Sequence, residues 1–487
     1  MRTTPGTLRP THSRPSTLGL VVRPPVSGES HYLYVPVDIP CGVTRLDVEM
    51  TYDRNPDNLV DIGLFDPRAG AFPTQEGFRG WSGGARDSFF LGQGGATPGY
   101  VAGEMLPGRW MILLGLVSIP DGGLPLRLAA RVSNAPVDET DNPDTTVSRY
   151  RGPGWYRGDC HAHTFHSDAK GAPEVLHEEA KIAGLDFLFI TDHNNMTAWS
   201  NYFRSASSEE LLFLPGMEIT TMDGHANALG ISRWVDFRME LPGDPAILAR
   251  QVGAAGGLLS INHDKPPIPW RHPRPRMDCI EVWQRHWLAA NDISLARYDQ
   301  LLRKGRRITA IGGSDYHQPA SIDLSVPFRL GTPTTVLHCE ELSQDGVIRA
   351  IKSGQAYVTE APNGPSIVLE ANGSGMGGIL PSGSAQSICT SISGAPGDEF
   401  VLVSDKGECA RQAIDSAEFV SELPVPQEAI FVRGEIQAHA SRRQLLDDAF
   451  AAFSTNGLPR VVDASAIEQT PLRRALSNPI YFGDWNP

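Results

Sequence analysis

Strands and helices alternate along the middle of the chain, and this alternation constrains the fold most. Short apolar runs typical of buried strands fall at residues 155–163, 187–191, 211–220, 227–231, 258–263, 279–283, 308–312, 336–338 and 355–359. Segments with helical spacing fall at residues 173–183, 245–255, 292–304 and 343–352. Because connecting helices cover the strands that they join, the pattern predicts an α/β barrel or a parallel sheet.

The two flanks of this segment have a different pattern. Between residues 18 and 135, short alternating runs separated by Gly, Pro, Asp and Asn are typical of an antiparallel β-sandwich. Residues 362–487 return to short strands with glycine-rich turns and predict a second β-sandwich-like domain. We expect residues 1–17 to form a disordered arm and residues 136–150 a linker, which leaves an α/β domain at residues 151–361.

Composition excludes several classes of protein. The 487 residues carry a net charge of −14 with no basic cluster, which argues against nucleic acid as a partner. No apolar run approaches the ~20 residues that span a bilayer, and the N-terminus lacks the apolar core of a signal peptide. The six cysteines include no CxxC pair. We therefore expect a cytoplasmic enzyme without a membrane partner, for which a homo-oligomer is compatible with the sequence.

Histidines and carboxylates gather at the ends of the predicted strands. They are His161, His163, Asp168, His193, Glu218, His225, His263, Asp315 and His317. Residues two apart in an extended chain point to the same side, so both imidazoles of an HxH pair can reach one cation. Imidazole and carboxylate together suit zinc, manganese or iron. Nine ligands are too many for one ion, so the sequence predicts two or three divalent metal ions.

Single pairs of this kind are more often structural than metal-binding, and only their repetition at several strand ends favours a metal centre. His166, His272 and His286 are weaker candidates because they lie in loops whose direction the sequence does not fix. Asp159 and Asp192 precede metal-ligand candidates and are expected to orient imidazoles or to be ordinary turn residues.

On these residues the middle segment resembles the PHP (polymerase and histidinol phosphatase) superfamily. The motifs are GDCHAHTFHSDAKG, FITDHNN, PGMEITTMDGHANALGI, SINHDKP and GGSDYHQP. All nine ligand positions of the family pattern occur in order. The two departures are Asp168-Ala169, where the family usually has the Asp-Gly of an SDG motif, and Cys160, where Leu is frequent. The resemblance implies a distorted (β/α)7 barrel at residues 151–361. More narrowly, PGRWMILLG, GHANALGI and SNPIYF resemble the CehA/McbA group, which contains carbaryl hydrolases.

The resemblance also implies how the ligands divide among the metals. One ion would be held by His161, His163, Glu218 and Asp315. Glu218 would bridge to a second ion that His225 and His263 also hold. A third set, which would hold a further ion or complete a binuclear site, is Asp168, His193 and His317.

The activity that the resemblance implies is hydrolysis by a metal-activated water, with Asp192, Asp315 and His317 as catalytic residues. The first hypothesis is a phosphoesterase that acts on a small-molecule phosphomonoester or phosphodiester. The second is a hydrolase of carbamates or aryl esters, and a third, from another class, is a metal-binding module without turnover. A nuclease is disfavoured by the acidic charge.

Candidate substrate contacts lie in the loops beyond the strands. They are Asn194, Asn195, Lys265, Arg271, Trp283 and Arg285. Cationic side chains near the metals suit a phosphate, whereas tryptophans suit an aromatic leaving group. Both kinds are present, so these residues leave the choice between the ester classes open.

Overall fold

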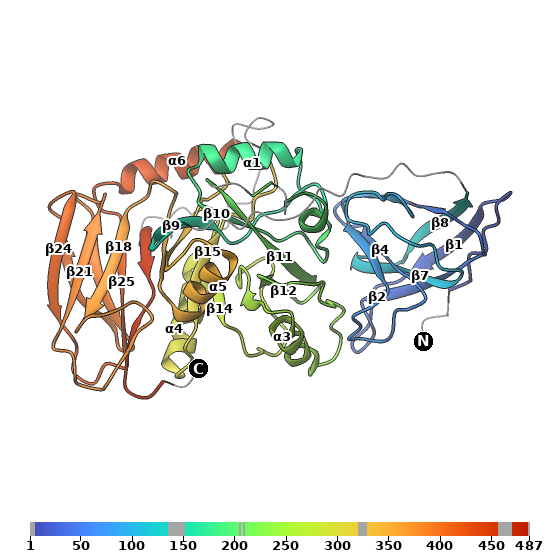
Figure 1. The fold of residues 1–487 in the computed structure, drawn as a ribbon. Helices are drawn as coiled ribbons and strands as arrows, with labels where there is room; N and C mark the ends of the chain where they lie inside the picture. Colours follow the sequence, from blue (N-terminus) through green and yellow to red (C-terminus); the bar gives the residue numbers. More distant parts are fainter. Residues whose placement is uncertain are drawn as a thin grey trace.

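The computed structural model describes residues 5–134, 151–203, 206–207, 210–319, 329–455 and 470–485. It is a mixed α/β structure with many strands and few helices. An N-terminal β-rich part in blue and a C-terminal β-rich part in orange lie on either side of a central α/β part (Figure 1). In the described ranges, no helix is long and apolar enough to cross a membrane.

The N-terminal part is built from two antiparallel four-stranded sheets. One contains β1 (Ser16–Val22), β8 (Leu124–Ser133), β3 (Arg45–Tyr52) and β6 (Ser88–Gly92), in this order. The other contains β2 (Tyr32–Ile39), β7 (Gly108–Ser118), β4 (Leu59–Phe65) and β5 (Phe78–Gly83). Alternate side chains of both sheets share one buried core, as the two-residue period of the sequence predicts.

Residues 8–17 differ from the disordered arm that we expected. Leu8 is fully buried in the sandwich core, and its backbone exchanges hydrogen bonds with Pro36 and Asp38. Strand β1 then begins at Ser16. One apolar side chain with paired backbone groups is enough to dock this polar segment, and composition alone does not reveal such a contact. The linker predicted at residues 136–150 lies outside the described residues.

The central part contains a curved sheet. Its strands are, in sheet order, β15 (Thr309–Gly313), β14 (Cys279–Gln284), β13 (Leu258–Ile261), β12 (Gly224–Leu229), β11 (Leu212–Thr221), β10 (Phe187–Ile190), β9 (Gly154–Asp159), β16 (Thr334–Cys339) and β17 (Ala356–Thr359). The sheet curves round so that the segments after β15 and β9 meet, because Asp315 N–H donates to the His161 carbonyl over 2.8 Å. Side chains that follow β9 and β15 are thereby placed next to each other.

The helices of the central part are α1 (Pro173–Ile182), the π-helical turn η1 (Trp199–Phe203), α3 (Asp244–Ala254), α4 (Asn291–Arg303) and α5 (Gln344–Ser353). All four helical segments predicted from the sequence are present within a residue or two. Helix α5 shows why: the Ser343 side chain accepts from Gly346 N–H at its start, and Gly354 ends it with a φ of 79°.

The regular (β/α)7 barrel implied by the resemblance is not confirmed. The β11–β12, β12–β13 and β9–β16 pairs are antiparallel, and the described helices are too few for seven β/α units. A short hairpin turn at residues 222–223 joins β11 to β12, so no helix can intervene.

The C-terminal part continues the central sheet through the β17–β26 pair. The strands that extend it are β26 (Arg473–Ser477), β25 (Phe431–Gln437), β22 (Glu399–Ser404) and β23 (Gly407–Ala413), with β20 (Ile379–Leu380) and β27 (Ile480–Phe482) at its side. A second sheet contains β19 (Ser374–Gly375), β18 (Ser366–Ala371), β21 (Ser387–Ser393) and β24 (Glu418–Pro424). A further helix, α6 (Arg442–Thr455), follows β25. The two sheets share one apolar core.

Candidate metal centre

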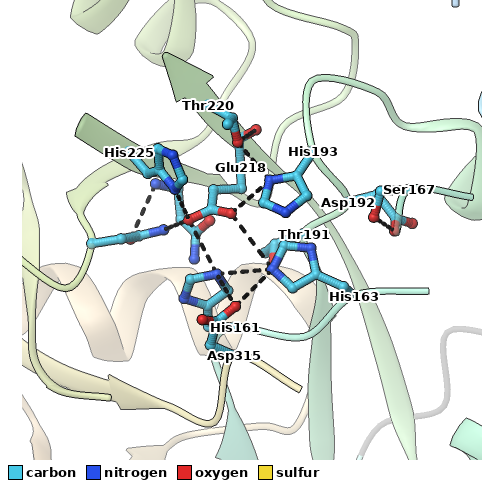
Figure 2. Close-up of polar contacts among 12 residues, drawn as sticks. His161, His163, Ser167, Thr191, Asp192, His193, Glu218, Thr220, His225 and Asp315 are labelled. Carbon is cyan, nitrogen blue, oxygen red and sulfur yellow. Dashed lines mark hydrogen bonds and ion pairs between the residues drawn. The ribbon is translucent and has the colours of Figure 1, made fainter. Parts of the chain in front are cut away.

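Imidazole and carboxylate side chains converge at one edge of the central sheet (Figure 2). They comprise all of the predicted ligands: His161, His163 and Asp168 after β9, His193 after β10, Glu218 on β11, His225 on β12, His263 after β13, and Asp315 and His317 after β15. The structure thus brings together residues that span more than 150 positions of the sequence.

Local strand geometry explains how two of these side chains meet. The β11–β12 register pairs Thr220 with His225. Because residues two apart on a strand share a face, Glu218 lies on the same face as Thr220 and therefore as His225. The distance from Glu218 Oε1 to His225 Nδ1 is 3.3 Å.

Three overlapping groups of side chains could each hold a metal ion. The groups are His163, Asp168, His193 and His317; His161, His163 and Asp315; and His161, Glu218 and His263. In each group one ligand atom of every member lies within 4.8 Å of the others. His161 and His163 belong to two groups each, so the three groups form one connected centre.

Glu218 occupies the middle of this centre and is fully buried. Its Oε1 lies 3.2 Å from His161 Nε2 and 3.2 Å from His263 Nε2. Its other oxygen, Oε2, lies 2.9 Å from His193 Nδ1. A carboxylate with imidazoles on both oxygens has the arrangement that a bridging ligand between two cations requires.

The donor set fits a divalent cation. The Glu281 carboxylate lies 2.9 Å from His161 Nδ1, so this nitrogen carries the proton and Nε2 is the free ligand atom. His161 Nε2 faces His163 Nε2 at 3.1 Å, and Asp315 Oδ1 lies 3.1 Å from the latter nitrogen. Lone pairs that converge at such distances repel one another unless a cation or a proton lies between them.

The pKa shifts of the ligand side chains also indicate that the buried carboxylates require positive charge beside them. Burial alone would raise the pKa of Glu218, but His161, His225 and His193 hold it well below its usual range. Burial would lower the pKa of His193, yet Asp168 and Glu218 raise it to about 10. The buried carboxylates are therefore stabilised only together with cationic neighbours, a role that bound divalent ions also fulfil.

Glu281 is a positioning residue that sequence reasoning missed. It is 2% exposed on β14, and its Oε2 accepts the His263 N–H at 2.7 Å while Oε1 contacts His161. One carboxylate thus orients two ligand candidates. The signal available in the sequence was a lone acidic residue in the apolar strand Cys279–Gln284.

The backbone is strained at several positions of the centre. Asn194, His263, Arg285 and Asp315 have positive φ values of 54°, 24°, 58° and 51°. Residues other than glycine adopt this conformation at a cost of about 1–3 kcal/mol, and such residues cluster at functional sites. Two of the four are predicted ligands, which fits a site whose geometry is imposed by the surrounding fold.

Asp192, predicted as a catalytic residue, has its carboxylate hydrogen-bonded to the protein itself. Its carboxylate accepts the N–H and hydroxyl of Thr164 at 2.8 and 2.7 Å, and the hydroxyl of Ser167 at 2.6 Å. It therefore holds the segment that carries His163 and Asp168. Asp159 acts similarly, because it accepts the N–H groups of His161 and Ser314.

Several predicted substrate contacts point into the protein instead. The Asn194 amide forms hydrogen bonds with the backbone of Thr220. The Asn195 amide forms hydrogen bonds with the backbone of its own loop. Trp283 is 2% exposed, packs against Trp287 and donates to a backbone carbonyl. Loop position alone could not distinguish side chains that face the site from those that hold the loop.

The three cationic candidates have different surroundings. Lys265 is buried and donates to the Gln284 carbonyl and to Asn291, and burial lowers its pKa to about 7. Arg271 is exposed. The Arg285 side chain contacts a predicted ligand, because its Nη2 lies 2.7 Å from Asp315 Oδ2.

Part of the chain matches a protein-family model. Residues 159–302 match the model of the PHP domain, and this segment contains seven of the nine predicted ligands. No curated protein matches the chain. Residues 159–302 are thus similar to the PHP domain, whereas the CehA/McbA group stays a prediction.

Three solved structures are similar to parts of the chain. A two-domain protein of Bacteroides vulgatus that contains a predicted PHP-like metal-dependent phosphoesterase is 19% identical to this chain, with a TM-score of 0.36. The match covers 61% of this chain and 94% of the Bacteroides chain. A proposed metal-dependent phosphoesterase of Bifidobacterium adolescentis is 18% identical, with a TM-score of 0.29 over 40% and 94%. An amidohydrolase of Chromobacterium violaceum is 15% identical, with a TM-score of 0.26 over 34% and 88%.

Proposed function

We propose that the protein is a metal-dependent hydrolase of a small-molecule ester, with phosphomonoesters or phosphodiesters as the preferred class. The observation that carries this proposal is the position of Glu218, buried among imidazoles at the point where the ligand groups meet. The PHP-domain match over residues 159–302 supports the same class of chemistry.

The three groups of side chains would hold two or three divalent ions. When bound, such ions supply Lewis acidity and a water of lowered pKa for hydrolysis. Gln284 and Arg285 both donate to Asp315 Oδ2 and so fix this carboxylate. His317 is held through Nδ1, which donates to the Asp315 carbonyl at 2.8 Å, so its Nε2 is the atom available at the site.

The surroundings of the centre favour a phosphate over an aryl ester. Arg285 presents a guanidinium beside Asp315, and its side chain is 30% exposed, so it can also contact an anionic substrate. Trp283, the residue that would have favoured an aromatic leaving group, is packed in the core. Carbamate or aryl ester hydrolysis is therefore the alternative, and a module without turnover would have no need of the whole ligand set.

The test combines metal analysis with a matched substrate panel. Protein purified without chelator is assayed, with Mn²⁺ or Zn²⁺ added, on p-nitrophenyl phosphate, bis-p-nitrophenyl phosphate and an aryl N-methylcarbamate. We expect turnover of a phosphate ester that disappears after chelation and returns with metal. Turnover of the carbamate alone would overturn the preferred substrate class, and bound metal without any turnover would support the non-catalytic module.

A further inference from the structure

The segment that carries three of the predicted ligands is held from outside by the N-terminal sandwich. We call residues 160–170, between β9 and α1, the ligand loop. Arg86 lies between β5 and β6 of the sandwich and donates to two carbonyl oxygens of this loop, those of Ser167, at 3.0 Å, and of Phe165. Ser167 directly precedes Asp168.

A second contact from the sandwich lies close to the first. Gly99 N–H donates to Thr197 Oγ1 at 3.1 Å, and this hydroxyl also lies 2.8 Å from His166 Nδ1 in the ligand loop. Gly99 has a φ of 95°, and a Cβ there would come within 2.7 Å of the His166 carbonyl oxygen. The sandwich backbone therefore touches the ligand loop closely, and glycine is required for that approach.

Asp168 depends on its loop more than the other carboxylate ligands do. Its side chain is 43% exposed, whereas those of Glu218 and Asp315 are 1% and 10% exposed. Surrounding side chains therefore fix the position of the Glu218 carboxylate, whereas the position of the Asp168 carboxylate depends on the backbone of its loop. From there its Oδ1 lies 3.4 Å from His193 Nε2 and 3.2 Å from His317 Nε2.

Hydrogen bonds hold the ligand loop from two sides. On the inside, Asp192 accepts hydrogen bonds from Thr164 and Ser167. On the outside, Arg86 donates to the carbonyl oxygens of Phe165 and Ser167. An arginine with two N–H groups on two carbonyls fixes direction as well as distance.

We propose that Arg86 is a positioning residue of the metal centre, supplied by the N-terminal sandwich to keep Asp168 within reach of His193 and His317. The inference rests on the proposed metal-binding function and gives the sandwich a part in it. It concerns the group that contains Asp168, because Arg86 binds the carbonyls of Phe165 and Ser167 beside it. His161, which belongs to both other groups, is instead held by Asp159 and Glu281. One ion should therefore depend on Arg86 and another should not.

The test measures metal binding rather than turnover. The full-length protein and the variants Arg86→Ala, Arg86→Lys and Arg54→Ala are stripped with chelator and titrated with Mn²⁺, followed by EPR, with stoichiometry from ICP-MS. Arg54 is the matched control, because it lies on the same sandwich and pairs with Asp87 instead of the ligand loop. Circular dichroism verifies that each variant is folded.

We expect Arg86→Ala to weaken the binding of one ion by roughly 10–100-fold, the usual cost of losing a group that orients a metal ligand. Arg86→Lys, which offers a single donor nitrogen in place of two, should lie between the wild type and Arg86→Ala. Arg54→Ala should match the wild type. If Arg86→Ala does not fold, the inference is tested by comparing the Mn²⁺ affinity of Arg86→Lys with that of Arg54→Ala.

Unchanged Mn²⁺ affinity and stoichiometry in a folded Arg86 variant would overturn the inference and leave the proposed hydrolase intact. Equal weakening of every ion would also overturn it, because the effect would then be general destabilisation. A wild-type protein that binds no metal would overturn the proposed function, and the inference with it.

Discussion

At the scale of single residues, the centre is defined by which atom each side chain turns toward the shared space. Histidine offers two ring nitrogens, and only a fixed partner on one of them makes the other a dependable ligand. Glu281 gives His161 this partner, and the Asp315 carbonyl gives it to His317. These partners are as necessary to the account as the ligands themselves.

Glu281→Gln tests this directly. The glutamine amide would donate to His161 Nδ1, which forces the ring into the opposite tautomer and places a proton on Nε2, the predicted ligand atom. We expect metal affinity to fall by roughly 10–100-fold while the fold is kept. Isothermal titration with Zn²⁺ measures this, with Glu341→Gln as the control, since Glu341 pairs with Arg349 at the surface. Equal affinities in the two variants would contradict the assigned tautomer.

Much of the centre could be predicted from the sequence, because its ligands follow apolar strands and this placement is a local pattern. The residues that sequence reasoning misplaced are of another kind. Asn194, Asn195, Lys265 and Trp283 follow the same strand ends, but their side chains pair with or pack against the protein itself. Side-chain direction in a loop depends on tertiary partners, which no local pattern encodes.

At the scale of elements, helices were predictable because a proline or a capping serine marks three of the starts and glycines follow the ends, whereas strand pairing was not. The predicted strand at residues 227–231 is observed as β12, which starts at Gly224 and forms an antiparallel hairpin with β11. The pairing follows from the short turn and from contacts distant in sequence. A regular barrel inferred from alternation therefore overlooks this reversal.

The junction between β25 and α4 makes a prediction at this scale. Arg433 is 2% exposed and binds Asp299 of α4 at 2.8 Å and Glu435 of β25 at 2.7 Å. Removal of one partner from a buried ion pair typically costs about 3–5 kcal/mol. We expect Arg433→Ala to lower the free energy of unfolding by this amount in urea titrations. A decrease in the free energy of unfolding below about 1 kcal/mol would show that this ion-pair junction contributes little to stability.

The same junction predicts a pH dependence. Burial raises the pKa of Glu435, but Arg433 and Arg473 together lower it from 4.5 to about 2. A carboxyl group with a depressed pKa stabilises the fold above its unfolded pKa, and this contribution is lost as the pH falls from about 4.5 toward 2. Urea unfolding of the wild type at pH 6, 4 and 3 should therefore be more pH-dependent than that of Glu435→Gln. Parallel curves would contradict the assigned shift.

At the scale of the whole molecule, the three parts are joined by contacts rather than only by the chain. Asp236 of the central part accepts the Thr74 N–H at 2.9 Å, and Arg238 donates to Tyr34 at 3.1 Å, both across the junction with the N-terminal sandwich. On the other side the central sheet runs into the C-terminal strands through β26.

Asn478 tests whether the central and C-terminal parts unfold together. It is 1% exposed, accepts the Ala310 N–H at 2.7 Å and donates to the carbonyls of Ala310 and Ala356. Asn478→Ala leaves buried backbone groups unpaired, at about 1–3 kcal/mol each. We expect calorimetry to show a lower melting temperature for one shared transition. A shift confined to a separate transition would show that the two parts are independent.

The central claim is that Glu218 joins the ligand groups into one multinuclear metal centre. It is tested most directly by the metal content, per folded chain, of the wild type and Glu218→Gln after purification without chelator, measured by ICP-MS. Glutamine keeps the shape of the side chain but removes the charge that faces His161, His193 and His263. We expect two or three divalent ions in the wild type and the loss of at least one in the variant. Equal metal content in both proteins, or none in either, would contradict it.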